Sequence, residues 1–529
     1  MKNHTFAVFS ISLTVIFATL SFNVHAQNHG ALFTDEATAK QIFYSGNMAE
    51  AAKHFKELLR VDSMHYEYNM MAGYAYLHSN VDKKQAITHY LRAIKNPKAD
   101  LYIYYDLGNA YMLCYQFDEA IEYFQTFLKK GGKVQKGDLP AERCIEMCEN
   151  AQVLINLRNN VTIEHLASEI NSPYPDFNAY IDENESILYF TSKQTQNSGS
   201  TLDYDGFKMA DIYCSEFIEG KWSKAKKLLP PINSAQTENI VGLTHNGETM
   251  LLYFNNDKGF DDIFTSHKEK KQFSRPEMLN LSVNSNYTEE AAMISPDGNW
   301  LFFSSNRPDG LGGLDIYYSK RLPNGEWSNA QNAGPNINTR YDDNYPYLAP
   351  DGSTFFFSSK GHNSMGGYDL FKSLWNAEEQ FFAIPENLAF PINTPDDNRT
   401  ISVSKSGRYA YIADYRGESC GDMDIYKVTF QDVVAPYSVF KGVISDIDST
   451  ELLQTISQYK AVIRDAGSKN IIGNYRPEPH DGRFTFILQP GLYLIDLYAN
   501  ETEVSRTRLT VADREPAEKC PIIELKKQP

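Results

Sequence analysis

Acidic side chains recur at similar positions in five segments in the middle of the chain. Each stands shortly before a strand-like run, and the five are Asp176, Glu238, Glu289, Asp343 and Asp397. If these runs are the inner strands of a ring of sheets, their starts converge at one mouth of a central channel. A ring of carboxylates there would bind cations or basic peptides. Two alternatives stay open: repeated hydrogen bonding to neighbouring loops, and a metal site.

Motifs of well-known enzyme chemistry do not occur in the sequence. There is no His-Glu-x-x-His, no Gly-x-Ser-x-Gly elbow, no phosphate-binding loop and no dinucleotide fingerprint. The 12 His are scattered, and His245 and His362 have no clear acid or nucleophile partner in the sequence. Residues 203–206 resemble the start of a calcium loop but lack the distal Glu. We therefore expect no catalytic residues, no bound metal and no cofactor, and we expect that the protein is not an enzyme.

The charge balance excludes another class of function. The chain has 529 residues, with 67 Asp and Glu against 50 Lys and Arg, and a net charge of −17. Sequence-independent nucleic-acid binding needs clustered basic side chains, so it is not expected. The 6 Cys show no spacing typical of a disulfide framework. We therefore expect the cysteines to be buried and to pack like small apolar residues. The length suggests about three or four domains.

Residues 1–26 have the pattern of a signal peptide. Lys2 is the only charged residue before Asp35, and residues 6–22 are apolar with Ser and Thr. The residues that follow fit cleavage after Ala26. The apolar run is short for a membrane span of about 20 residues, and an uncleaved anchor is the alternative. We therefore expect an exported protein, in the periplasm or at the periplasmic face of the outer membrane, with no transmembrane span in the mature chain.

Residues 33–158 are predicted to be helical, because Gly and Pro are sparse and apolar residues recur every three or four positions. Three segments superpose, and the clearest contains Tyr104, Leu107, Gly108, Tyr111, Ala120, Phe124 and Phe127. This set resembles the tetratricopeptide repeat, in which small residues allow close helix packing and aromatic residues fill the next groove. The resemblance implies a helical solenoid whose concave side holds a peptide or a partner helix. A plain helical bundle is the alternative.

Residues 161–432 contain five copies of a second repeat, with a period of roughly 50 residues. Each copy carries a triplet of Asp, an aliphatic residue and an aromatic residue, starting at Asp211, Asp262, Asp315, Asp369 and Asp424. Tight turns such as residues 295–298 precede aromatic strands. The set resembles the WD40-like β-propeller repeats of bacterial exported proteins, most closely over residues 304–317. We predict a five-bladed β-propeller, with six blades as the alternative if residues 431–440 add strands.

The points at which the series of repeats begins and ends predict how the ring closes. The fifth copy ends near Phe430 without the strand, marked by Ile-Asn, that closes the other copies. An unmatched strand of that type, residues 161–171, stands before the first triplet. We expect it to complete the fifth sheet, which removes an exposed edge.

In residues 437–512, apolar and polar residues alternate as in the strands of a small β-sandwich. Turn residues stand at Asp481-Gly482 and Pro490-Gly491. The pattern resembles the carboxypeptidase regulatory-like domain, a transthyretin-like sandwich that is a packing module and contains no peptidase. Residues 513–529 are expected to form a C-terminal tail. The fold class is therefore multidomain, α first and then all-β.

The order of these segments is more specific than any single motif. It resembles a family of OmpA-related envelope proteins of Bacteroidetes, of the PorE-like type. The resemblance implies a non-enzymatic scaffold or adaptor that links type IX secretion or gliding machinery to the cell wall. Its partners would be envelope proteins, bound through the helical groove and the propeller face.

One departure from this family concerns the cell wall. Its members carry a C-terminal OmpA-like domain that binds peptidoglycan, and no such domain is found in this sequence. Any peptidoglycan link is therefore expected to be indirect. Two other hypotheses stay open: a module that binds glycan or peptidoglycan fragments at the propeller mouth, and a hydrolase that uses propeller loops.

Overall fold

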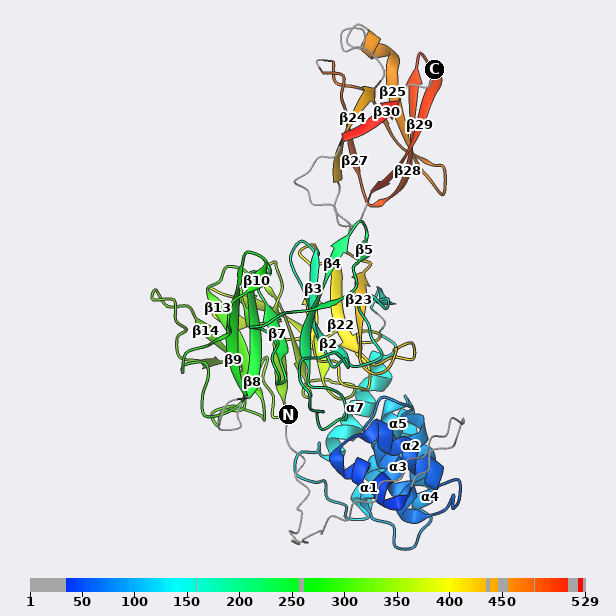
Figure 1. The fold of residues 1–529 in the computed structure, drawn as a ribbon, viewed down its shortest axis with the longest axis vertical. Coiled ribbons are helices and arrows are strands. Elements are labelled where there is room, and N and C mark those ends of the chain that lie inside the picture. The colour runs from blue at the N-terminus through cyan, green and yellow to red at the C-terminus, as the bar shows by residue number, and fades with distance from the viewer. Residues whose placement is uncertain are drawn as a thin grey trace, which may run out of the picture.

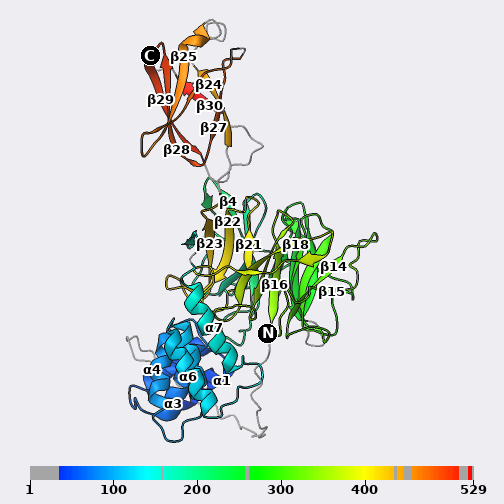
Figure 2. The same ribbon diagram turned by 180° about the vertical axis from the view of Figure 1, so that it is seen from behind.

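The computed structural model describes residues 35–157, 159–255, 261–433, 438–445, 455–479, 481–511 and 522–526. The predicted signal peptide, residues 1–26, lies outside these ranges. Figure 1 shows a helical layer, a ring of β-sheets and a small β-sandwich in a row, and Figure 2 shows the same order from behind. Within the described part of the chain, no helix has both the length and the apolar character needed to cross a membrane.

Seven α-helices in the described residues form the first part, which confirms the prediction of a helical N-terminal region. They are α1 (Glu36–Ser45), α2 (Met48–Leu58), α3 (Tyr66–Leu77), α4 (Lys84–Ala93), α5 (Tyr102–Leu113), α6 (Phe117–Lys129) and α7 (Ala141–Leu154). Glycines in α3 and α5 allow their close packing. A Cβ atom on Gly73 would lie 2.9 Å from the ring of Tyr90, and one on Gly108 would lie 2.6 Å from the ring of Phe124. Only a residue without a side chain permits these approaches.

Each of the five predicted repeats forms one antiparallel sheet. The first sheet contains β2 (Asp176–Ile181), β3 (Ile187–Ser192), β4 (Asp211–Ile218), β5 (Lys221–Trp222) and β6 (Lys226–Lys227). The second contains β7 (Asn239–Leu243), β8 (Thr249–Asn255), β9 (Asp261–Glu269), β10 (Gln272–Phe273) and β11 (Glu277–Met278). The third contains β12 (Glu289–Ile294), β13 (Trp300–Ser305), β14 (Asp315–Lys320) and β15 (Gln331–Asn332). The fourth contains β16 (Asp343–Leu348), β17 (Thr354–Ser359), β18 (Asp369–Asn376), β19 (Phe381–Phe382) and β20 (Glu386–Asn387). The fifth contains β21 (Ile401–Val403), β22 (Tyr409–Asp414), β23 (Asp424–Phe430) and β1 (Val161–His165).

These sheets close into a ring, so this part of the chain is a β-propeller. The inner strand β7 packs against β2 and β12, β12 packs against β16, and β21 packs against β2. Between the fourth and fifth sheets, the hydroxyl of Tyr347 donates to the carbonyl of Val403 at 3.0 Å. Strand β1 pairs with β23, with Val161 opposite Phe430. The prediction that the segment beginning at Val161 completes the fifth sheet is confirmed.

The last part of the chain is a sandwich of two sheets. One sheet contains β24 (Ser438–Ser445), β27 (Phe484–Leu488) and β30 (Ile522–Lys526). The other contains β25 (Tyr459–Asp465), β26 (Ile471–Tyr475), β28 (Gly491–Ala499) and β29 (Thr502–Val511), and a short 3-10 helix, η1 (Ile456–Gln458), precedes β25.

The structure differs from two of the segment boundaries that the sequence predicted. Strand β30 lies in the predicted tail, but it pairs in parallel with β24 and buries Leu525, so it belongs to the sandwich. Strand β24 starts inside residues 431–440, which were the possible source of further propeller strands, and it also joins the sandwich.

Loops at one end of the ring hold the helical layer. Lys83 forms an ion pair with Asp396, and Asn80 donates to Asp422 at 2.8 Å. Arg143 of α7 is buried and donates at 2.9 to 3.2 Å to the carbonyls of Lys360, Gly361 and His362. The helices therefore sit at the mouth where the inner strands begin, here called the helix-side mouth. The sandwich follows β23 at the opposite end of the ring, the far mouth (Figure 1).

Candidate functional site

Four of the five predicted acidic residues stand at the starts of inner strands and are fully buried. They are Asp176, Glu238, Glu289 and Asp343. Each accepts a hydrogen bond from a hydroxyl group four residues earlier, and the donors are Ser172, Ser234, Ser285 and Thr339. The structure thus places these carboxylates inside the packed loops and not on a solvent-lined rim. Their surroundings fit the alternative of repeated hydrogen bonding to neighbouring loops.

Asp397 lies in a different environment from the other four. The counterpart of the buried acids in the fifth sheet is Asn398, whose side-chain oxygen accepts from the Thr394 N–H at 2.6 Å. The side chain of Asp397 is 34% exposed. The sequence does contain a signal for this difference. Each buried acid follows the Asn of the Ile-Asn mark by five residues, and Asn398 stands at that distance from Asn393.

The buried positions lie at the junctions between sheets. Their backbone N–H groups donate to the carbonyl of the residue just before a triplet Asp. For Asp176, Glu238, Asp343 and Asn398, these acceptors are Met423, Ala210, Leu314 and Tyr368, at 2.8, 3.0, 2.7 and 2.6 Å. The inner residue of one sheet therefore lies beside the triplet Asp of the sheet before it. Burial raises the pKa of Asp176 to about 7 and that of Asp343 to about 8, so these carboxyl groups hold protons near neutral pH.

Charged and aromatic side chains cluster at the helix-side mouth, between the fourth and fifth sheets. Arg399 Nη2 lies 2.6 Å from Asp397 Oδ2, and the guanidinium lies 5.6 Å from the centre of the Tyr368 ring. The Tyr368 N–H donates to Asp397 Oδ1 at 2.9 Å, and Lys360 Nζ lies 4.5 Å from the same ring centre. Burial alone would raise the pKa of Asp397, but Arg399 and Lys360 hold it well below the usual range. The Arg399 side chain is 43% exposed, so a solute can reach it.

Tyr345 extends this cluster toward the third sheet. Its ring centre lies 6.3 Å from that of Tyr368, and its φ is 50° within a bulge of β16. The neighbouring Asn344 donates to Glu290 of β12 at 2.8 Å. Burial raises the pKa of Tyr345 to about 12, so its hydroxyl stays neutral at physiological pH. Cationic, anionic, amide and phenol groups together suit a polar ligand such as a sugar or a peptide. Of the residues in this cluster, only Asp397 was predicted from the sequence.

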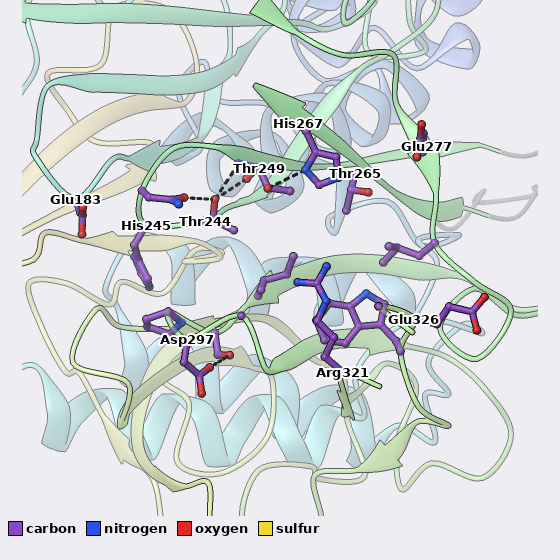
Figure 3. Close-up of a pocket in the computed structure, with 18 of the residues that line it drawn as sticks. Glu183, Thr244, His245, Thr249, Thr265, His267, Glu277, Asp297, Arg321 and Glu326 are labelled. Carbon is purple, nitrogen blue, oxygen red and sulfur yellow. Dashed lines mark hydrogen bonds between the residues drawn. The ribbon is translucent and has the colours of Figure 1, made fainter. Parts of the chain in front are cut away.

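A cavity of about 650 Å3 opens at the far mouth, between the second and third sheets (Figure 3). Its apolar floor includes Leu279, Ile294 and Trp327. Its rim carries four acidic residues and two basic ones: Glu183, Glu277, Asp297 and Glu326, with Arg321 and Lys405. Figure 3 shows Glu183 and Asp297 on one side of the hollow, Glu277 and Glu326 on the other, and Arg321 between them. An acidic rim around an apolar floor fits a segment that combines basic and apolar residues.

Two histidines line this cavity, and both are engaged with the fold. A ring nitrogen of His245 lies 2.9 Å from the carbonyl of Leu348, and burial lowers the pKa of this imidazole. A ring nitrogen of His267 lies 3.0 Å from the hydroxyl of Thr249. These contacts hold the two rings to neighbouring strands.

The helical layer presents a third surface, formed by aromatic residues of α1 and α3. The ring of Tyr74 lies 5.5 Å from that of Phe43 and 4.0 Å from that of His78. Tyr44, next to Phe43, is 73% exposed. Such a surface suits the contact with a peptide or helix that the sequence predicts, although that role stays a prediction.

The loop that resembles a calcium site holds an internal cation instead. Lys193 Nζ lies 2.8 Å from Asp203 Oδ2 and also pairs with Asp205. Because the ammonium group of Lys193 pairs with both carboxylates, the loop is a salt-bridged turn.

Comparisons with known proteins identify no family for this chain. No family model matches the chain, and no curated protein matches it. TolB from Acinetobacter baumannii is similar in structure, at 14% identity over 56% of this chain and 71% of that one, with a TM-score of 0.33. A β-xylosidase/α-arabinofuranosidase from a compost microbial metagenome is similar at 13% identity over 51% of this chain and 94% of that one, with a TM-score of 0.33. An α-L-arabinofuranosidase from Lactobacillus brevis is similar at 10% identity over 51% and 94%, with a TM-score of 0.31. The PorE-like assignment therefore stays a prediction.

Proposed function

We propose that this protein is a non-enzymatic scaffold of the cell envelope that binds segments of other envelope proteins. The observation that carries the proposal is the cavity at the far mouth, where acidic side chains surround an apolar floor. The described α-helices of the helical layer contact the opposite mouth. In this proposal the helices are a tetratricopeptide-like solenoid, the ring is a five-bladed propeller, and the last part is a transthyretin-like sandwich.

Charge complementarity gives the chemistry of the partner segment. Glu277 and Glu326 are exposed at the rim, and Met278 beside them is 53% exposed. Arg321 is also exposed at the rim, and its guanidinium lies 5.4 Å from the centre of the Trp327 ring. A segment with a Lys or Arg next to an apolar residue would place its charge at the rim and its apolar side chain on the floor.

The buried acids support a structural rather than a catalytic role. Asp176 and Asp343 use their oxygens to fix their own loops, so they are not poised for proton transfer to a solute. The aromatic face of the helical layer would be a second contact surface. We place the protein in the periplasm or at the periplasmic face of the outer membrane, associated with type IX secretion or gliding machinery and linked only indirectly to peptidoglycan.

The test is a tagged pull-down from mildly crosslinked envelopes, identified by mass spectrometry, with matched variants. Glu277→Lys combined with Glu326→Lys reverses two rim charges. Glu164→Lys combined with Glu216→Lys makes the same charge change at exposed strand positions away from the cavity. The proposal expects secretion or gliding components with the wild type and the control, and their loss with the rim variant. Equal recovery by all three proteins would exclude the cavity as the binding site.

The cluster at the helix-side mouth favours a second candidate, the binding of glycan or peptidoglycan fragments. The ring of Tyr345 is only partly buried and offers a face for sugar stacking, and Arg399 offers a hydrogen-bonding fork. Calorimetric titration with purified wall fragments tests this function. Binding by the wild type that disappears in Arg399→Ala supports it, and no heat with the wild type removes it.

A further inference from the structure

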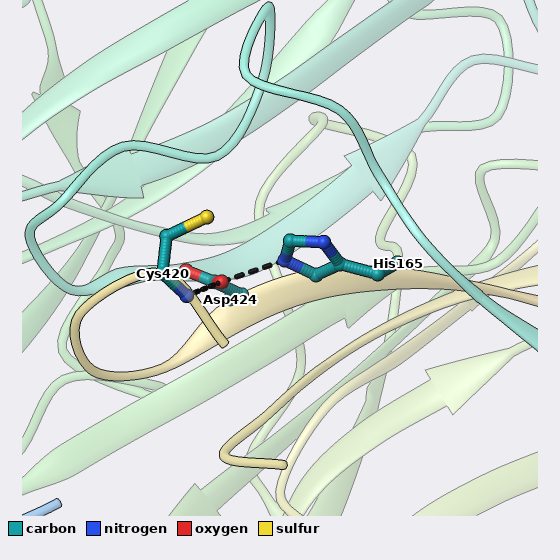
Figure 4. Close-up of side chains that lie close together, drawn as sticks. All are labelled: His165, Cys420 and Asp424. Atoms are coloured by element: carbon teal, nitrogen blue, oxygen red, sulfur yellow. Dashed lines mark hydrogen bonds and ion pairs between the residues drawn. The ribbon is translucent and has the colours of Figure 1, made fainter. Parts of the chain in front are cut away.

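Three side chains with metal-binding chemistry converge where the ring closes. His165 is the last residue of β1, Asp424 is the first residue of β23, and Cys420 lies in the loop just before β23. One ligand atom from each lies within 4.8 Å of the others. Figure 4 shows the Asp424 carboxylate between the imidazole and the loop that carries Cys420. The thiol is exposed, contrary to the sequence-based expectation of buried cysteines.

The Asp424 carboxylate is fully buried but only half used. Its Oδ2 lies 2.7 Å from His165 Nε2 and accepts from the Cys420 N–H at 2.6 Å. Its Oδ1 has no hydrogen-bond partner. The same is true of Oδ1 of Asp176, the buried acid on the inner strand of the next sheet. A fully buried carboxylate with an unpartnered oxygen, as in Asp424, calls for a hydrogen-bond donor or a positive charge.

Two other junctions place a basic side chain beside a buried acid. Lys227 lies 3.3 Å from the triplet residue Asp211, and Arg307 lies 3.1 Å from Glu289. At the closing junction, in the part of the chain that the structure describes, the only basic group within 4.0 Å of Asp424 is His165. His165 occupies the strand position that Lys227 occupies in the first sheet. His165 lies opposite Tyr426, and Lys227 lies opposite Tyr213, the aromatic residue of its own triplet. The closing junction thus replaces an ammonium group with an imidazole and adds a thiol.

We propose that this closing junction binds a zinc ion through the His165 imidazole, the Cys420 thiolate and the Asp424 carboxylate. Imidazole, thiolate and carboxylate are the ligands that Zn2+ prefers, in a tetrahedral arrangement completed by water or by a fourth side chain. Bonds of 2.0–2.3 Å place tetrahedral ligands roughly 3.4 Å apart, so Cys420 must move inward from the present spacing. Its position in an exposed loop allows that movement. On binding, the thiol releases its proton to solvent, and the imidazole uses an unprotonated nitrogen.

Such an ion would join the two ends of the propeller. His165 belongs to the N-terminal strand, whereas Cys420 and Asp424 belong to the last hairpin, so the metal crosslinks strands that are far apart in sequence. Because the unfolded chain does not hold these ligands together, zinc would stabilise the closed ring.

The test measures zinc and cobalt binding to the purified full chain after removal of any affinity tag. We expect one tight zinc site per chain in competition with a chromogenic chelator, and a thiolate-to-metal absorption band with Co2+. Cys420→Ser should abolish this band and weaken zinc binding by more than about tenfold, since even loss of a supporting residue costs at least that much. His165→Gln should weaken binding to a similar extent.

Two controls keep the result interpretable. Cys114→Ser and His267→Gln remove a thiol and an imidazole elsewhere and should leave zinc affinity unchanged. If His165→Gln opens the ring and fails to fold, Cys420→Ser, which changes only an exposed loop, still decides the question. Zinc affinity that is equal in Cys420→Ser and the wild type, or a wild type with no zinc site or no thiolate band, would overturn the proposal.

Discussion

The loops that follow β13 and β17 begin with the same residues and then diverge. Both open with a Ser-Ser pair, residues 304–305 and 358–359, but the second residue after the pair is Arg307 in one loop and Gly361 in the other. Arg307 folds back, so that its Nη2 lies 3.1 Å from Glu289 Oε1 with only 14% of the side chain exposed. This loop supplies a cation to its own buried acid.

The second loop has a glycine where the first has an arginine. A Cβ atom on Gly361 would lie 2.2 Å from the Thr339 hydroxyl, so the position has no room for a side chain. Its carbonyl accepts a hydrogen bond from Arg143 of the helical layer at 2.9 Å, and Asp343 beneath it has no basic group within 4.0 Å in the described residues. The two loops therefore differ in what they bind: the first neutralises its own acid, and the second accepts hydrogen bonds from the helical layer.

The largest effect should come from removing the internal cation. Arg307→Met leaves Glu289 buried without its basic partner, and we expect the propeller to lose about 3–5 kcal/mol, the usual cost of breaking a buried pair. Burial raises the pKa of Glu289, so protonation can relieve part of this loss in acid. The loss in the free energy of unfolding should therefore be greater at about pH 8 than at about pH 5, as measured by scanning calorimetry.

Arg321→Met is the matched control. The Arg321 guanidinium lies 5.4 Å from the Trp327 ring at the cavity rim, where the residue is exposed. We expect a change within about 0.5 kcal/mol. Equal losses in the two variants would show that burial of the acid is not what makes Arg307 important.

The second effect is a pH dependence at the loop that lacks a cation. Burial raises the pKa of Asp343 from 3.8 to about 8. Between those values the folded protein holds a proton that the unfolded chain has lost, so stability falls as pH rises, by up to about 1.4 kcal/mol per pH unit. Asp343→Asn has no proton to lose. We expect it to gain stability relative to the wild type from about pH 5 to about pH 8, as seen in calorimetric transitions.

Asn398→Asp makes the opposite change at the corresponding position of the fifth sheet. It places a second acid beside Asp369, whose own pKa burial raises to about 7. This variant should lose stability relative to the wild type over the same pH interval. If both variants follow the pH dependence of the wild type, the junction acids are ionised and the comparison between the two loops fails.

Sequence repeats predicted the architecture because their marks are local. Turn residues and alternating strands specified the five sheets, and the unmatched segment at Val161 specified the closing strand. The direction of the acidic side chains was not predictable in the same way. A bulge follows the acid in several inner strands, with register shifts between Phe177 and Tyr180 and between Asn344 and Tyr347. Bulges break the two-residue alternation that tells which face a side chain occupies.

The cluster around Arg399 escaped prediction for a different reason. Its members share no spacing, and Tyr345 and Tyr368 of the fourth sheet lie beside Arg399 only when the fifth sheet packs against the fourth. The zinc ligands have the same origin, because His165 and Asp424 meet only when the first and last strands pair. Repeated motifs reveal only what the five repeats share, whereas these sites depend on what distinguishes one repeat from the next.

The smallest effect should come from an exposed ion pair that joins the same two sheets as the closing junction. Lys405 Nζ lies 3.2 Å from Glu183 Oε2, and the Lys405 side chain is 65% exposed. Water and salt screen such a pair, so Lys405→Met should change the free energy of unfolding by less than about 0.5 kcal/mol. Calorimetry at low and high salt checks this value. A loss as large as that of Arg307→Met would mean that contacts across the closing junction, and not burial of the acid, control the stability of the ring.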